Sequence, residues 1–158
     1  MKLLSALFVF SLLFVTTPVA LAMKDVVFPT ELVVNKGKKS VETDADITFS
    51  DSGLKIVPDK KDLSDATKEF AYSNIKTVDY SFAKKPMLSG GGAVATALLV
   101  SVFVAVPLLF VKKKRYWAVV RTENDYAVLK LGSDNHRQII EEFRARGVSV
   151  SELKEEGK

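Results

Sequence analysis

A long uncharged stretch between two lysines constrains this chain more than any other feature of its sequence. Residues 86–111 carry no charge, and Thr96 and Ser101 are the only polar residues between 93 and 111. A helix of about 19 residues is roughly 28 Å long, close to the hydrocarbon thickness of about 30 Å in a bilayer. The stretch therefore predicts a hydrophobic, membrane-associated insert, which spans residues 86–115 when its basic flank is included.

The flank after this stretch is basic and aromatic. The chain has a formal net charge of +4, and the four consecutive basic residues at 112–115 alone carry four positive charges. A local cluster beside an apolar stretch is typical of a membrane boundary, where aromatic side chains also gather, and no basic stripe indicates nucleic acid. We therefore expect no nucleic-acid partner, and we predict that membrane lipid is contacted by Lys112, Lys113, Lys114, Arg115, Tyr116 and Trp117.

The first 22 residues have the organisation of a secretory signal peptide. Lys2 precedes an uncharged run, and the sequence Ala20-Leu21-Ala22 supplies a cleavage motif of small residues. Cleavage there makes Met23 the mature N-terminus; an uncleaved signal anchor is the alternative. The chain has no cysteine, which excludes a lipid-modified cysteine, disulfides and thiolate chemistry.

Short strands are predicted on both sides of the insert. Residues 41–50 alternate between apolar and polar, which indicates a strand with one buried face. A turn at residues 35–38 joins this strand to an earlier one at 32–34, further strands are predicted at 54–57, 69–72 and 75–82, and a charged loop is expected at 58–67. The part before the insert, residues 23–85, therefore provides five strands.

Residues 116–150 are predicted to form a hairpin and a helix. Strands at 116–122 and 126–131 are followed by a helix capped by Ser133 or Asp134 and ended by Gly147. Its apolar stripe consists of Ile139, Ile140 and Phe143, with Glu142 and Arg146 as an i,i+4 pair. Residues 151–158 are expected to be a charged tail, frayed from Glu152 onward.

This order of elements resembles a pleckstrin-homology-like domain of the bacterial PH/GRAM-like branch. The best local match is EFAYSNIKTVDY at residues 69–80, which is similar to the I-x-Y-x-x-I-x-x-V-x-Y rhythm of such domains, and residues 134–150 resemble their closing helix. The layout also resembles uncharacterised bacterial envelope proteins with an apolar insert before the last hairpin. The resemblance implies a mainly β fold, a seven-stranded PH-like barrel with a C-terminal helix, interrupted here by a hydrophobic membrane helix. With the signal peptide, it implies an exported, membrane-associated envelope protein.

Two arrangements of the insert remain open. A single membrane crossing puts the first five strands and the last two on opposite sides, and the basic flank favours it. A closed barrel keeps all strands on one side, and it satisfies strand edges that are otherwise unpaired. We favour closure, which predicts a shared ladder between residues 75–82 and 117–120.

No residue pattern indicates catalysis, a metal or a cofactor. The sequence lacks a nucleophile elbow, a phosphate-binding loop and a zinc-binding helix motif, so we expect no enzyme. The single histidine, His136, is predicted to be a surface residue, and Asp44 and Asp46 to lie on a solvated strand face. By resemblance, an anion-binding turn is formed by Lys36, Lys38 and Lys39. The expected function is a non-enzymatic envelope module that binds lipid head groups or a protein; the alternative is a single-pass envelope sensor or adaptor with an outer β-rich part and a basic inner tail.

Overall fold

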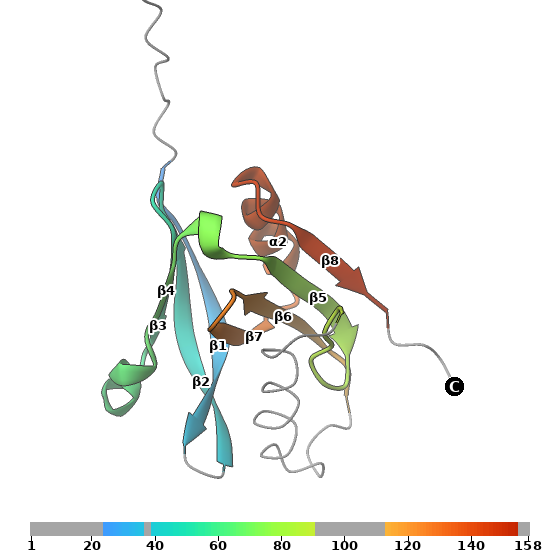
Figure 1. Ribbon diagram of the computed structural model, residues 1–158. Helices are drawn as coiled ribbons and strands as arrows, with labels where there is room; N and C mark the ends of the chain where they lie inside the picture. The colour runs from blue at the N-terminus through green and yellow to red at the C-terminus, as the bar shows by residue number, and fades with distance from the viewer. Residues whose placement is uncertain (1–23, 37–38, 91–112, 155–158) are drawn as a thin grey trace, which may run out of the picture.

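One curled β-sheet with a short C-terminal helix makes up the described part of the protein. The computed structural model describes residues 24–36, 39–90 and 113–154. Eight strands form a single sheet in the order β4-β3-β2-β1-β7-β6-β5-β8, which curls into a half-barrel (Figure 1). The strands are β1 Val26–Lys36, β2 Lys39–Phe49, β3 Leu54–Pro58, β4 Lys68–Phe70, β5 Thr77–Ala83, β6 Arg115–Arg121, β7 Tyr126–Leu131 and β8 Val150–Leu153.

The hairpin of β1 and β2 confirms the alternation seen in the sequence. Its register runs from Val26 opposite Phe49 to Lys36 opposite Lys39. The side chains of Ala45 and Ile47 are buried, whereas Asp44 and Asp46 are exposed, as predicted. The residues of β2 alternate because successive side chains of a strand point to opposite faces of the sheet.

The strands on either side of the insert share one ladder. β5 and β6 pair antiparallel over seven positions, from Thr77 opposite Arg121 to Ala83 opposite Arg115. β6 continues into β7, and β7 pairs with β1 through three residue pairs. The five strands before the insert and the two after it therefore belong to one sheet, as the closed arrangement predicts. The expected seven-stranded barrel is not confirmed, because the sheet in the described part of the chain has eight strands and is a half-barrel with β4 and β8 at its two ends.

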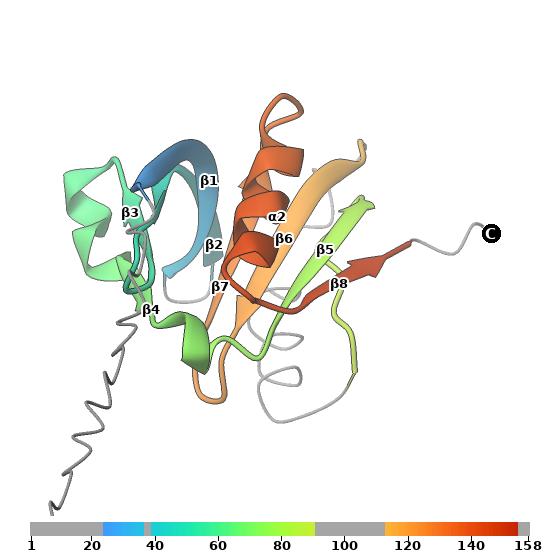
Figure 2. The ribbon, with the colours of Figure 1, turned by 90° about the horizontal axis from the view of Figure 1, so that it is seen from above.

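The helix α2 (His136–Ala145) packs inside the curl of the sheet, beside β5, β6 and β7 (Figure 2). Ile139, Ile140 and Phe143 are buried in the main core, which confirms the predicted stripe. Phe143 meets Phe49 of β2 edge to face, with ring centroids 4.9 Å apart. Gly147 ends the helix at φ +75°, a conformation that glycine adopts without steric cost.

Three local expectations are wrong. Residues 150–153 form β8, which pairs parallel with β5, where a tail frayed from Glu152 was expected. The loop at 58–67 contains a 3₁₀ helix, η1 (Lys61–Ala66), and a second short one, η2, spans Tyr72–Asn74. Asn135 occupies the cap position of α2 without a side-chain capping bond. The sequence does not reveal β8 because its stability comes from the open edge of β5, not from its own residues.

Among the described residues, no helix is both long and apolar enough to cross a membrane. The predicted hydrophobic helix at residues 93–111 lies outside the described ranges. The predicted signal peptide, residues 1–22, lies outside them as well.

Candidate functional site

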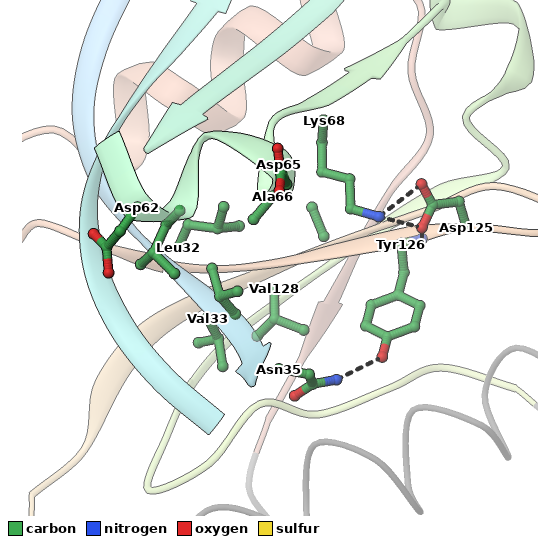
Figure 3. Close-up of a pocket in the computed structure, with 13 residues that line it drawn as sticks. Leu32, Val33, Asn35, Asp62, Asp65, Ala66, Lys68, Asp125, Tyr126 and Val128 are labelled. Atoms are coloured by element: carbon green, nitrogen blue, oxygen red, sulfur yellow. Dashed lines mark hydrogen bonds and ion pairs between the residues drawn. The ribbon is translucent and has the colours of Figure 1, made fainter. Parts of the chain in front are cut away.

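One cavity opens where β1 and β7 part, and we call it the seam pocket. The two strands pair only from Glu31 opposite Lys130 to Val33 opposite Val128, although β1 continues to Lys36 and β7 begins at Tyr126. The pocket has a volume of about 520 Å³ and lies between this seam and η1 (Figure 3). Its walls include apolar side chains of both strands, among them the ladder partners Val33 and Val128.

Two polar contacts hold the rim of the seam pocket. Lys68 Nζ of β4 lies 2.6 Å and 2.9 Å from the two carboxylate oxygens of Asp125 (Figure 3). Asn35 Nδ2 donates to the Tyr126 hydroxyl at 3.3 Å. Among the described residues no group of His, Cys, Asp or Glu is arranged to hold a metal ion. The seam pocket therefore combines apolar walls from β1 and β7 with charged side chains from η1, β4 and the β6–β7 turn.

A second cavity, the aromatic pocket, lies between α2 and β5. It has a volume of about 350 Å³, and its floor contains Tyr80, Tyr116 and His136. Tyr80 Oη and His136 Nδ1 lie 2.7 Å apart. The rings of Tyr116 and His136 stack with centroids 3.7 Å apart and an angle of 7° between their planes. Charged side chains line its mouth, namely Arg137, Glu141, Arg144 and Glu152.

The prediction for His136 as a surface residue is wrong. Its side chain is buried, with a relative exposure of 7%, because the register of β5 and β6 puts Tyr80 and Tyr116 against the first turn of α2. Burial lowers the pKa of His136 below its ordinary value, and nearby Arg137 lowers it further, while Asp134 opposes the shift. Burial also raises the pKa of Tyr80, and Tyr116 adds to this. The imidazole is therefore neutral at neutral pH, and the tyrosine stays protonated.

The free energy of unfolding is expected to fall as the pH is lowered from about 7 to about 5.5. The pKa of His136 is lowered from 6.5 in the folded state, so the unfolded chain binds a proton more readily than the folded protein. The stability that the neutral imidazole of His136 contributes is present above the pKa of this histidine in the unfolded chain, and it is lost as the pH falls below that pKa. Urea denaturation at several pH values measures this dependence. Because the chain has one histidine, His136→Gln should flatten the curve over this range; an unchanged slope contradicts the assignment.

A buried ion pair lies on the opposite face of the sheet. Asp79 of β5 has a side-chain exposure of 0% and Arg121 of β6 one of 11%, and Arg121 Nε lies 2.7 Å from Asp79 Oδ2. No aligned hydrogen bond joins these two atoms, so their contact is coulombic. Ser89 completes the cluster: its hydroxyl donates to Asp79 Oδ1, and Arg121 Nη2 donates to its carbonyl at 2.8 Å. The cluster fixes the first residues of the insert, at Ser89, onto β6.

The predicted lipid-contact residues are not equivalent in the structure. Lys113, Lys114 and Arg115 are exposed. Tyr116 is half-buried and faces α2, whereas Trp117 is 6% exposed on the other face, where its Nε1 donates to the carbonyl of Ala83 at 3.1 Å. The burial of the indole leaves it little surface for a lipid. Whether these residues contact lipid stays a prediction, and Lys112 lies outside the described residues.

The predicted anion-binding turn can be placed only in part. The backbones of Lys36 and Lys39 pair at the end of the β1–β2 hairpin. Their side chains and the whole of Lys38 lie outside the described residues. Sequence reasoning did not identify the ion pair of Asp79 with Arg121, because these two residues are 42 positions apart in the chain. It also did not identify the contact of Tyr80 with His136, because these residues lie on different elements.

Comparison with known proteins adds a distant likeness of fold. No model of a known protein family matches the chain, and no curated protein matches it. Among solved structures, the hSac2 domain from human phosphoinositide phosphatase Sac2 is similar, with a TM-score of 0.46 and 11% sequence identity. The likeness covers 85% of this chain and 80% of that one. At this level of similarity, nothing about activity or ligand carries over to this chain.

Proposed function

We propose that the chain is a non-enzymatic, membrane-attached PH/GRAM-like binding module of the cell envelope, which contacts lipid head groups or a protein partner. The observation that supports it is the ladder between β5 and β6. Ala83 and Arg115 are ladder partners, so their Cα atoms are about 5 Å apart. The segment between them leaves the sheet and returns to the same place.

This pairing argues for an insert that enters the bilayer from one side. A single crossing separates the ends of a segment by about 30 Å. Ladder partners cannot be that far apart, so a single crossing requires β5 to detach from β6. Detachment would also break the contact of Ser89 with Arg121 and expose the buried charges of Asp79 and Arg121. The apolar residues 93–111 are therefore better explained as a one-sided membrane attachment of an intact domain.

The PH-like assignment is supported by the order of elements. Five strands precede the insert, two strands follow it, and α2 packs against the sheet, as the resemblance at residues 69–80 implies. β8 is an addition to that pattern. The seam pocket and the aromatic pocket offer cavities for a ligand, and neither contains a set of residues that indicates a reaction. Binding is therefore the function that this geometry supports.

Protease accessibility of two tags tests the topology. One tag is placed after Lys24 and one after Lys158, and protease is added to spheroplasts of cells that express the full chain. We expect both tags to be digested together, because the strands on both sides of the insert share one sheet. Digestion of one tag with protection of the other favours the single-pass sensor or adaptor.

Vesicle flotation tests the attachment itself. The full chain is expected to float with phosphatidylcholine vesicles, and the double variant Leu99→Arg with Val104→Arg is expected to remain in the dense fraction. A charged residue at the centre of an apolar helix costs about 2.5–3.5 kcal/mol for insertion. A full chain that stays unbound contradicts the proposal. The matched control is Lys60→Arg with Lys61→Arg, two exposed positions where η1 begins.

A further inference from the structure

An exposed phenylalanine lies at the end of β5 nearest the basic flank. Phe82 is 47% exposed, and among the described residues it is the only exposed aromatic side chain. The other exposed large apolar residues are Val27, Val41 and Val57, which lie on β1, β2 and β3. A single exposed apolar side chain is common on protein surfaces, so a contact surface is indicated here only together with the charged residues at the same strand end.

The ring of Phe82 is held in place by its neighbours. Phe82 is the ladder partner of Tyr116, and their ring centroids are 4.6 Å apart. Tyr116 in turn stacks on the buried His136. Because His136 holds the ring of Tyr116, the ring of Phe82 that rests on Tyr116 also has a defined orientation. The exposed part of the Phe82 ring lies on the face of the sheet that α2 covers.

Exposed basic residues lie at the same ends of β5 and β6 as this ring, and Arg115, next to Tyr116 on β6, projects from the opposite face of the sheet. Lys84 follows the end of β5, and Lys113 and Arg115 precede and begin β6; all three are exposed. No carboxylate pairs with any of them in the part of the chain that the structure describes. An aromatic ring among cationic groups is the composition that binds the head-group region of an anionic bilayer.

We propose that this aromatic-basic edge, formed by Phe82, Lys84, Lys113 and Arg115, docks on an anionic lipid surface and orients the domain on it. The inference rests on the proposed membrane attachment and adds a second contact, made by the folded sheet. Phe82 enters the interface, and the basic residues neutralise lipid charge. The edge lies beside the face that α2 covers, so docking turns this face and the aromatic pocket toward the head groups.

The charge contribution is tested with vesicles of two compositions. Each basic residue near an anionic surface contributes about fivefold to binding. Lys84→Gln with Arg115→Gln should therefore weaken binding to phosphatidylglycerol-containing vesicles about 25-fold and leave binding to pure phosphatidylcholine unchanged. The control Lys60→Gln with Lys61→Gln, also exposed and remote from this edge, should have no effect. Equal binding of both double variants to the anionic vesicles overturns the proposal.

The position of Phe82 is tested by fluorescence. The chain has one tryptophan, and Trp117 is buried, so its emission should change little on vesicle addition. Phe82→Trp should show a blue shift and quenching by brominated lipid, whereas Val57→Trp, at an exposed position of β3, should show neither. An unshifted emission from Phe82→Trp on bound vesicles overturns the proposal. That outcome leaves the membrane attachment intact, because the attachment fails only if the full chain does not bind vesicles.

Discussion

Replacing Asp79 with alanine is expected to lower the free energy of unfolding by about 3–5 kcal/mol, the cost of leaving a buried charge without its partner. The guanidinium of Arg121 has a side-chain exposure of only 11%, so water cannot replace the lost carboxylate. Urea denaturation of the full chain, followed by circular dichroism, measures the change. Because domains of this size are stable by about 5–15 kcal/mol, the variant should be close to unfolding.

A double variant distinguishes the loss of the ion pair from a general loss of packing. Asp79→Ala with Arg121→Met removes both charges, and it should be more stable than Asp79→Ala alone. An apolar pair of similar volume satisfies the site because no buried charge remains. If the double variant is as unstable as the sum of the single ones, the two charges do not interact in the way that the structure indicates.

The pair also affects the start of the insert. Ser89 is bound by both Asp79 and Arg121, and Leu88 packs against the cluster of Trp117, Val119 and Val128. Without the pair, these first residues of the insert lose the contacts of Ser89 with the sheet. Cleavage by a protease after Lys85 is therefore expected to accelerate in Asp79→Ala more than global unfolding alone explains.

Replacing Phe143 with alanine is expected to destabilise the protein by about 3–5 kcal/mol. The side chain is fully buried and contacts Phe49 edge to face, so its removal leaves a cavity between α2 and the sheet. Thermal unfolding of the full chain measures the effect. Phe143→Leu should cost less because it keeps most of the volume.

An exposed position provides the comparison. Val27→Ala, at a residue that is 54% exposed on β1, is expected to change stability by about 0.5 kcal/mol or less. A similar loss for Phe143→Ala and Val27→Ala would show that α2 is not packed on the sheet as the structure has it. A loss confined to Phe143→Ala supports the helix as the closing element of the core.

The aromatic pocket shows where prediction from the sequence stops. His136 was expected at the surface because it has no partner at a spacing that a helix could bring together. Its partners are Tyr80, 56 residues earlier, and Tyr116, on the neighbouring strand. Only the register of β5 with β6, together with the packing of α2 over both, puts the three rings in contact.

The sequence by itself determined the elements that depend on local patterns. The alternation at residues 41–50 predicted β2, the apolar stripe predicted the buried face of α2, and Gly147 predicted where the helix ends. These features follow from periodicities of two and 3.6 residues and from the backbone freedom of glycine, so neighbouring residues suffice to define them.

The tertiary structure alone decided which distant residues meet. It fixed the register in which β5 pairs with β6, buried Asp79 against Arg121, and added β8 to an open edge. The physical reason is that ladder register and burial depend on how much surface the whole chain removes from water. No short stretch of sequence contains that information.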